Sequence, residues 1–509
     1  MLIVRTAPGR RRGPAGTCAT CVALQANRNR PICGSFVQTG GSCSPPDGPE
    51  HRLSCLGCAI GALVGALLLL ATTAGANSPA QPTVGTTGIP SVLPVVGVSP
   101  YSAQITWPAV PGAATVEVYN GSTLIDEFPT SSNDSYTVRE LWPATSYTFT
   151  VNLLSATGAT LVSLSGTGVT PQATGAFPRL YAGNAFINTP IAGSPSLDSN
   201  SSGMVSSALV AYQGGANFAD SDAWGIPIVS ADTQSRSYDV GCMYEGCWHH
   251  FAAVHIPTMA KPSTGSDGHL VVLEPNGSEM DMWMAQNTGS GWTAGSRWLG
   301  SATGPAVDCT SYNGCTGADA ANFELAAGMV RPEEIAQGHI DHALIITTPY
   351  TRSGYTACPA EGSDGRNASP NALPMGAHVQ LDPSIDVAAL NIPAWQKVIA
   401  VALQQYGAYV GDTGGSQAVE AENNLGRPGY DAWANAGVSA DAPSLSDLPW
   451  SSMRVLSMTQ CGTEVSSRQA RTRGSRAPAR RASAGRRRSP ARDTRGERRG
   501  RGRAARARG

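Results

Sequence analysis

The sequence predicts a mainly β protein, with a small β-sandwich followed by a larger β-sandwich or jelly-roll-like domain that carries one or two helices. Three observations lead to this fold class. Apolar residues alternate over many short runs, 58 glycines and 36 prolines interrupt them, and few stretches have helical spacing. Short strands between frequent turns are typical of antiparallel sandwiches.

The first sandwich is predicted over residues 92–172, after a Pro/Thr/Gly/Ser-rich linker over residues 77–91. Apolar residues alternate from Ala103 to Trp107, and Asn120-Gly121 between alternating strands predicts a tight hairpin. These patterns place a compact all-β module directly after the linker.

The segment Leu141–Val151, LWPATSYTFTV, resembles the fibronectin type III signature L-x-P-x-T-x-Y-x-F-x-V. Trp107 matches that family's core tryptophan, and Tyr147 matches its corner tyrosine, whose hydroxyl bonds the backbone at a strand-to-strand turn. The resemblance covers about 80 residues. It implies a sandwich without catalytic residues of its own, acting as a spacer or a weak adhesion unit.

Residues 179–457 form the predicted functional domain. Leu270–Leu273, Met280–Ala285 and Ala343–Thr348 are among its short apolar runs. Two stretches have helical character, Asp319–Met329 and Pro393–Gln405. No repeat of about 50 residues is present, which argues against a propeller.

Charge is distributed unevenly along the chain. The net charge of −1 combines arginine-rich ends with a middle part of 11 basic and 32 acidic residues. Nucleic acid repels a surface of that sign, so we expect no nucleic-acid partner for the folded part.

A hydrophobic segment is predicted over residues 53–76. Leu56–Ala74 carries no charge, is about one bilayer thick, and ends in the small-x-small pattern Ala74-Gly75-Ala76. We expect a signal peptide or a membrane anchor, and therefore a secreted or membrane-anchored extracellular protein whose only membrane contact is this segment. Residues 1–52 are basic and cysteine-containing, and are either disordered or the product of a start codon assigned too early.

The tail over residues 462–509 is rich in Arg, Ala, Gly, Pro and Ser, without apolar periodicity. It cannot bury a core, so it is predicted to be disordered. It is either a polybasic arm or, as we favour, an out-of-frame reading of GC-rich codons.

Six of the twelve cysteines follow the hydrophobic segment, where an oxidising compartment favours disulfides. Cys242 and Cys247 are close enough for one small-loop disulfide, and Cys309 and Cys315 for another. The spacing does not determine how Cys358 and Cys461 pair.

Histidines gather between His249 and His378, but His249-His250-x4-His255 lacks the glutamate of a metalloprotease H-E-x-x-H helix. No metal site is predicted, and no cofactor is assigned. Asp267-Gly268-His269 leads into an apolar strand. Residues two apart on a strand share a face, so Asp267 and His269 would project together, and a carboxylate beside an imidazole suits a general base. A structural Asp–His hydrogen bond is the alternative.

Two further stretches complete the candidates. Asp281 and Trp283 share a strand face, and Trp283 can stack on a sugar ring or pack in the core. Pro332 with two glutamates suits a helix start and Gly338 its end, and a strand follows over Ile340–Thr348.

The domain resembles an uncharacterised family of secreted bacterial proteins that shares D-x-H, R-x-E-E-x(3)-G-x-I-x-H-A-L and Y-G-x-x-V-x-D in this order. The matching positions are Phe186–Pro190, Asp267/His269, Asp281/Trp283, Arg331–Leu344, Leu373–Gly376 and Tyr406–Asp412. His378 stands where the family usually has arginine, and Met280-Asp281 replaces an aromatic–Glu pair. The resemblance implies an architecture and candidate positions but no reaction.

We therefore expect a secreted or surface-attached protein acting on polysaccharide or cell-wall glycan, as a hydrolase or a lyase. The alternative is a non-catalytic glycan-binding, adhesion or structural envelope protein. The predicted catalytic residues are Asp267, His269, His342, Glu333, Tyr406 and Asp412. The predicted ligand-binding residues are Asn188, Asp281, Trp283 and His378.

Overall fold

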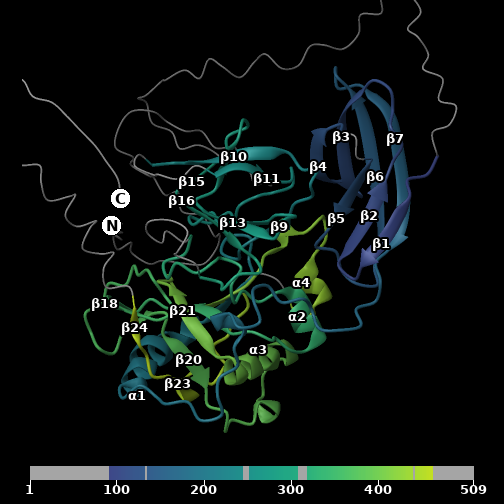
Figure 1. The fold of residues 1–509 in the computed structure, drawn as a ribbon. Helices are drawn as coiled ribbons and strands as arrows, with labels where there is room; N and C mark the ends of the chain where they lie inside the picture. The colour runs from purple at the N-terminus through teal and green to yellow at the C-terminus, as the bar shows by residue number, and fades with distance from the viewer. Residues whose placement is uncertain (1–90, 132–133, 245–250, 308–317, 439–441, 462–509) are drawn as a thin grey trace, which may run out of the picture. The chain divides into compact units, whose positions relative to one another are not determined.

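A computed structural model describes residues 91–131, 134–244, 251–307, 318–438 and 442–461. The predicted N-terminal region, hydrophobic segment and arginine-rich tail lie outside these ranges. Strands dominate the described part of the chain, which confirms the mainly β prediction (Figure 1). Among the described helices, none has the length and apolar character needed to cross a membrane.

Seven strands form the first sandwich. One sheet holds β1 (Val95–Ser99), β2 (Ser102–Thr106) and β5 (Ser135–Val138); the other holds β4 (Thr123–Pro129), β3 (Ala113–Asn120), β6 (Ser146–Ser155) and β7 (Thr160–Val169). Trp107, Phe128 and Phe149 are buried between the two sheets. The division into three and four antiparallel strands is a fibronectin type III-like sandwich.

The corner tyrosine and the hairpin lie where the sequence predicts them. The Tyr147 hydroxyl accepts a hydrogen bond of 2.7 Å from the backbone N–H of Trp142. Asn120 pairs with Thr123 across the β3–β4 turn, where Gly121 has a φ of 55°. A left-handed residue in this turn is readily supplied by glycine, which has no Cβ.

In the larger domain, the described residues form four sheets, and the strands of each are given in their spatial order. The six-stranded sheet is β23 (Met453–Val455), β20 (His378–Leu381), β21 (Ala408–Asp412), β17 (Leu344–Thr347), β22 (Ala418–Glu420) and β8 (Asn217–Ala219). A four-stranded sheet is β16 (Ser296–Ser301), β13 (Ser278–Trp283), β12 (Leu270–Leu273) and β9 (Ile228–Ser230). A second is β11 (Phe251–His255), β10 (Ser237–Cys242), β15 (Trp292–Ala294) and β14 (Gln286–Asn287). The last is β19 (Leu373–Met375), β18 (Thr351–Ala357) and β24 (Gln460–Cys461).

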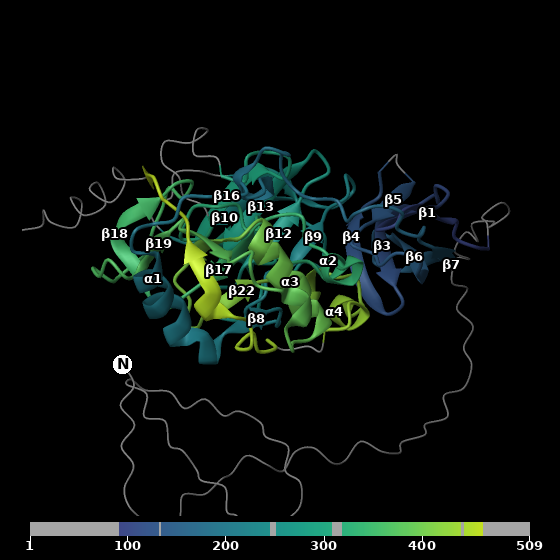
Figure 2. The same ribbon diagram turned by 90° about the horizontal axis from the view of Figure 1, so that it is seen from below.

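The predicted helix before Tyr406 is present as α3 (Ala394–Gln405), which packs along β20 (Figure 1). Ile399 and Leu403 are buried on its inner face. The helix predicted to start at Pro332 and to end at Gly338 is present as α2 (Pro332–Gln337), which lies beside α3 (Figure 2). Gly338 ends it with a φ of 87°. Two single-turn helices, α1 (Ser201–Met204) and α4 (Ala432–Asn435), complete the α-helices of the described residues.

The helix expected over Asp319–Met329 is wrong, because this segment forms turns. Asn322 and Gly328 have left-handed backbones, with φ of 64° and 68°. The backbone N–H groups of Leu325 and Ala326 donate to carboxylates of β13 instead of to carbonyls one helical turn earlier. Tertiary acceptors therefore replace the helical hydrogen bonds.

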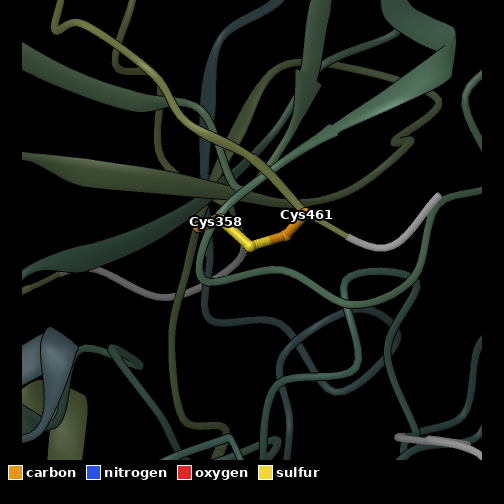
Figure 3. The surroundings of a disulfide bond; sticks show 2 residues. All are labelled: Cys358 and Cys461. Carbon is orange, nitrogen blue, oxygen red and sulfur yellow. A yellow bond between two sulfur atoms is a disulfide. The ribbon is translucent and has the colours of Figure 1, made fainter.

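Cys358, directly after β18, forms a disulfide with Cys461 in β24 (Figure 3). The bond joins positions 103 residues apart and holds the last described strand to the domain. Cys242 is also disulfide-bonded. Cys247, Cys309 and Cys315 lie outside the described residues, so the two small-loop disulfides stay predictions.

The sandwich is bonded to the larger domain through side chains that both parts bury. Asp126 of β4 is fully buried and accepts hydrogen bonds from the Ser235 hydroxyl, at 2.6 Å, and from the Thr258 backbone N–H, at 3.0 Å. The Met259 N–H donates to the carbonyl of Ile125 at 2.9 Å. These contacts make the sandwich more than a free spacer, because separating it would leave buried polar groups unpaired.

A buried ion network is the strongest of these connections. Arg427 makes a bidentate pair with Glu333 at 2.6 and 3.0 Å and a further bond of 2.6 Å to Glu422. Arg331 bonds Glu422 at 2.8 Å and also the carboxylate of Glu140, which belongs to the sandwich. The side chains of Arg427 and Glu422 are 1% and 0% exposed, so protein groups replace water around these charges.

Glu140 completes this network from the other module. Burial by itself raises the pKa of Glu140, but Arg331 and Arg427 outweigh that effect and lower it to about 2. Its carboxylate also accepts a hydrogen bond of 2.6 Å from Ser230. Glu140 therefore stays ionised and supplies the charge that two buried arginines need.

We expect Glu140→Gln to lower the free energy of unfolding by roughly 3 kcal/mol, because it leaves arginine charge buried without its partner. The measurement is denaturant unfolding of the full-length protein at neutral pH. Glu127→Gln is the matched control, since Glu127 also pairs across the two parts with Arg236, but at 3.5 Å with side chains 40% and 45% exposed. That exposed pair should be worth less than about 1 kcal/mol. Equal effects of the two variants would contradict the role given to the network.

The stability difference between wild type and Glu140→Gln should also depend on pH. Because the folded-state pKa of Glu140 lies below its ordinary value of 4.5, its stabilisation is complete above that value. The difference between wild type and Glu140→Gln should therefore shrink as pH falls from 4.5 to about 2. A difference that stays constant over this range would show that Glu140 does not act through its charge.

Candidate functional site

A large pocket in the larger domain brings together several of the predicted residues. Its volume is about 1450 Å³, above the usual 300–1,000 Å³ of small-molecule sites. Carboxyl groups and aromatic rings line it together. Its wall includes Asp267, His269, Trp283 and Asp412, all of them predicted from the sequence.

Asp267 and His269 reach the pocket from a turn, and not from the strand expected for them. β12 begins only at Leu270, and Gly268 between the pair has a φ of 48°. The carbonyls of Asp267 and Gly268 accept backbone hydrogen bonds of 2.7 and 2.9 Å from the chain that follows β13. The Trp283 indole N–H donates to Asp267 at 3.4 Å. The turn is held in place, so both side chains are positioned before any ligand arrives.

The imidazole of His269 is kept neutral. Burial lowers the pKa of His269 to about 4, against the opposing charge of Asp267 and a hydrogen bond to the backbone of Ala318. Its Nε2 atom is buried and has no hydrogen-bond partner among the described residues. A neutral ring with an unpartnered nitrogen is able to accept a proton or a hydrogen bond from a bound molecule.

Asp412 and Glu420 come from strands on either side of β17 and both line the pocket. Burial and the neighbouring Asp364 raise the pKa of Asp412 to about 7, with a smaller effect of Asp267. Burial together with Asp412 and Asp267 raises the pKa of Glu420 to about 8. At neutral pH, Glu420 is therefore mostly protonated and Asp412 is close to half-protonated.

Sequence reasoning missed several residues of this wall. Burial, Asp412 and Glu420 raise the pKa of Asp319 well above its usual range. The carboxylate of Asp364 accepts a short hydrogen bond from the Thr413 hydroxyl, while the Thr413 N–H donates to Asp412 at 2.6 Å. Only Ala418 and Val419 form an apolar pair before Glu420, so its sequence neighbours gave no signal of a site.

The expected convergence of His269 and His342 is not found, since His342 does not line the pocket. Its Nδ1 donates to the Ala343 carbonyl at 2.8 Å and its Nε2 lies 3.0 Å from Glu334. Burial alone lowers the pKa of His342, but Glu334 outweighs it and raises the pKa. This histidine stabilises the start of α2. Glu333 is likewise held by Arg427 in the ion network.

Two more predicted residues, His378 and Tyr406, lie around the end of α3 and do not line the pocket. The His378 Nε2–H donates to the Tyr406 carbonyl at 2.8 Å, and its ring stacks on Tyr409 with centroids 4.0 Å apart. Burial lowers the pKa of His378 to about 4. The ring of His378 is therefore neutral, and its contacts with Tyr406 and Tyr409 are structural.

Asn188 and Asp281 are buried in structural contacts. The Asn188 amide donates to the carbonyls of Leu180 and Ala182, at 2.8 and 3.0 Å. Asp281 accepts from the Leu325 N–H at 2.9 Å. Burial and the adjacent Glu279 and Glu324 raise the pKa of Asp281 well above its usual range. Neither residue lines the pocket, so neither reaches a ligand there.

Comparisons with known proteins add little beyond the sandwich. No protein family and no curated protein matches the sequence. Solved structures with partial similarity include a family 28 exopolygalacturonase from Yersinia enterocolitica, at 21% identity, TM-score 0.15, covering 16% of this chain and 20% of that one. A chitinase from Bacillus thuringiensis has 24% identity and TM-score 0.14, covering 16% and 13%. An Fn3-like protein from Clostridium thermocellum has 22% identity and TM-score 0.15, covering 17% and 96%. This chain thus spans about a fifth of the exopolygalacturonase and nearly all of the Fn3-like protein.

Among the described residues, no three His, Cys, Asp or Glu side chains are grouped so as to hold a metal ion.

Because Asp412 is buried beside other carboxyls, its ionisation should affect how stability depends on pH. Because its folded-state pKa of about 7 lies above the ordinary 3.8, the stabilisation of its neutral form is complete below 3.8 and is lost as pH rises through 7. Asp412→Asn should therefore match wild type at low pH and exceed it by about 4 kcal/mol above pH 8. Chemical unfolding across this range measures the difference. Asp447→Asn, at an exposed carboxyl outside the pocket, is the matched control for the substitution itself. Parallel curves for wild type and Asp412→Asn would contradict the assignment.

Proposed function

We propose that this protein is an extracellular hydrolase of polysaccharides, with its active site in the pocket around Asp267 and Asp412. The observation that carries the proposal is the mixture of protonation states in one pocket. Asp412, with a pKa of about 7, is able to donate a proton, while the negative charge of Asp267 acts on it from nearby. Glycoside hydrolysis uses such a pair, one carboxyl as acid and one carboxylate as nucleophile or base.

The remaining wall suits a sugar chain. Trp283 and Tyr355 line the pocket, and Trp224 lines it with 54% of its surface exposed. Aromatic faces stack on the apolar C–H surface of sugar rings. The volume of the pocket exceeds the usual size for a single small ligand, which favours several linked sugar residues.

Within this mechanism, each residue has a definite task. Asp412 donates its proton to the oxygen of the bond that breaks, and Asp267 attacks the sugar or activates water. Asp364 helps to keep the pKa of Asp412 high, and Glu420, with its own pKa raised to about 8, adds a second protonated carboxyl to the pocket. The Cys358–Cys461 disulfide supports the extracellular location, since such bonds persist in oxidising compartments.

The test is release of reducing sugar by the full-length protein from a panel of cell-wall and plant glycans. Asp412→Asn should lower kcat by 10²–10⁴-fold, the usual contribution of a general acid. Activity of the wild type should fall as pH rises above about 7, where Asp412 loses its proton. Asp447→Asn is the control with unchanged activity. Full activity of a folded Asp412→Asn would remove Asp412 from the reaction.

A glycan-binding protein without turnover is the second candidate, favoured by the exposure of Trp224 in the pocket wall. In that case Trp224→Ala should weaken glycan binding about fivefold, since stacking contributes about 1 kcal/mol. No sugar would be released at any pH. Calorimetric binding and product release on the same glycan separate the two functions.

A further inference from the structure

We infer that the pocket takes amino sugars with free, positively charged amino groups, in preference to neutral or acidic sugars. This inference rests on the proposed function, because it names the substrate class of the same pocket. The carboxyl groups that line the pocket have few positively charged side chains beside them. The acidic residues of the lining are Asp267, Asp319, Glu361, Asp364, Asp412 and Glu420.

Few positive charges oppose these carboxyls. Arg366 is the one arginine of the lining, no lysine belongs to it, and the Arg366 side chain is exposed. Among the described residues, no salt bridge joins any of the six carboxyls to an arginine, lysine or histidine. The segment over residues 308–317, which precedes Asp319, contains no arginine or lysine in its sequence. The wall therefore carries more negative charge than its own residues neutralise.

The ion network under the sandwich shows how the same protein treats carboxylates that it pairs. There Glu140 lies between two arginines, and its pKa falls to about 2. In the pocket the neighbours of Asp412 and Glu420 are other carboxyls, and their pKa values rise to about 7 and about 8. An ammonium group entering the pocket would supply the positive charge that arginine supplies in the ion network.

Two independent features indicate that a ligand, and not only solvent, belongs here. Trp224 exposes 54% of its surface, a large value for a tryptophan set in a pocket wall. Nε2 of His269 is buried in the same wall without a hydrogen-bond partner in the described part of the chain. A sugar with hydroxyl and amino groups would cover the indole and donate to this nitrogen.

The negative charge of the lining would repel a polyuronate. Each of its sugar carboxylates would enter a wall of like charge, which costs binding energy instead of providing it. A neutral glycan would avoid the repulsion but leave the carboxyls unpaired. The charge of the lining therefore distinguishes three classes of sugar polymer.

Three hexamers of equal length test this order. They are a β-1,4 hexamer of glucosamine, its fully N-acetylated form and a hexamer of galacturonic acid. Binding to the full-length protein is measured by calorimetry near pH 6 in a chelating buffer, at low and at high salt. We expect the glucosamine hexamer to bind at least about tenfold more tightly than the acetylated one, and the preference to shrink as salt screens the charges.

The double variant Glu361→Gln/Asp364→Asn removes two of the charges. It is compared with wild type by binding and not by rate, because loss of Asp364 also lowers the pKa of Asp412. It should reduce the preference for the free amine at least about threefold and leave binding of the acetylated hexamer unchanged. Asp447→Asn, outside the pocket, should change neither. If the double variant keeps the full preference for the glucosamine hexamer over the acetylated one, these two carboxylates do not bind the amine.

The outcomes separate this inference from the proposed hydrolysis. Equal or tighter binding of the acetylated or the galacturonic acid hexamer overturns the inference, and so does selectivity that appears only when a divalent metal is added. Product release from those sugars would leave the hydrolase standing. Selective binding of the glucosamine hexamer without release of product from any hexamer supports the amine site and overturns the hydrolase.

Discussion

The buried pairing of Arg331 and Arg427 with three glutamates is the constraint on which the rest of the structure depends. Transferring two guanidinium groups out of water is costly unless each meets carboxylates in good geometry. Glu333 and Glu422 come from the larger domain, and Glu140 comes from the sandwich. Neither module can therefore satisfy this cluster alone.

This pairing changes what the sandwich does. Modules of this type are often read as spacers, and the sequence offered no reason to expect more. Here Asp126 and Glu140 are buried against the larger domain, each with several hydrogen-bond donors. Arg331, at the start of α2, also lies over the ring of Phe177 at 4.9 Å, so the connection between the modules is packed against the same cluster. The sandwich is part of the fold that supports the larger domain.

The pocket uses the opposite electrostatic arrangement. In the network, Glu140 has arginine partners and stays ionised, whereas Asp412 and Glu420 lie among like charges and retain protons near neutral pH. Unpaired buried carboxyls lower stability, so a fold that keeps them must hold their backbones elsewhere. The six-stranded sheet, with β21 and β22 on either side of β17, provides that support.

Local patterns in the sequence were enough for some elements and not for others. The motif around Tyr147 and the helices α2 and α3 depend on nearby residues, and each lies where the sequence predicts it. The expected helix over Asp319–Met329 failed because carboxylates from β13, distant in sequence, take its backbone N–H groups. Half of the six predicted catalytic residues, Asp267, His269 and Asp412, line one pocket.

The sequence by itself determined the mainly β class, the signature of the first sandwich and the adjacency of Asp267 and His269, because those depend on spacing along the chain. Only the tertiary structure decided which charges are paired. Glu333 meets an arginine and Asp412 meets other carboxyls, yet the residues beside them in sequence do not distinguish the two. The ionisation of a carboxyl depends on burial and on charges brought close by folding, and both come from residues far away along the chain.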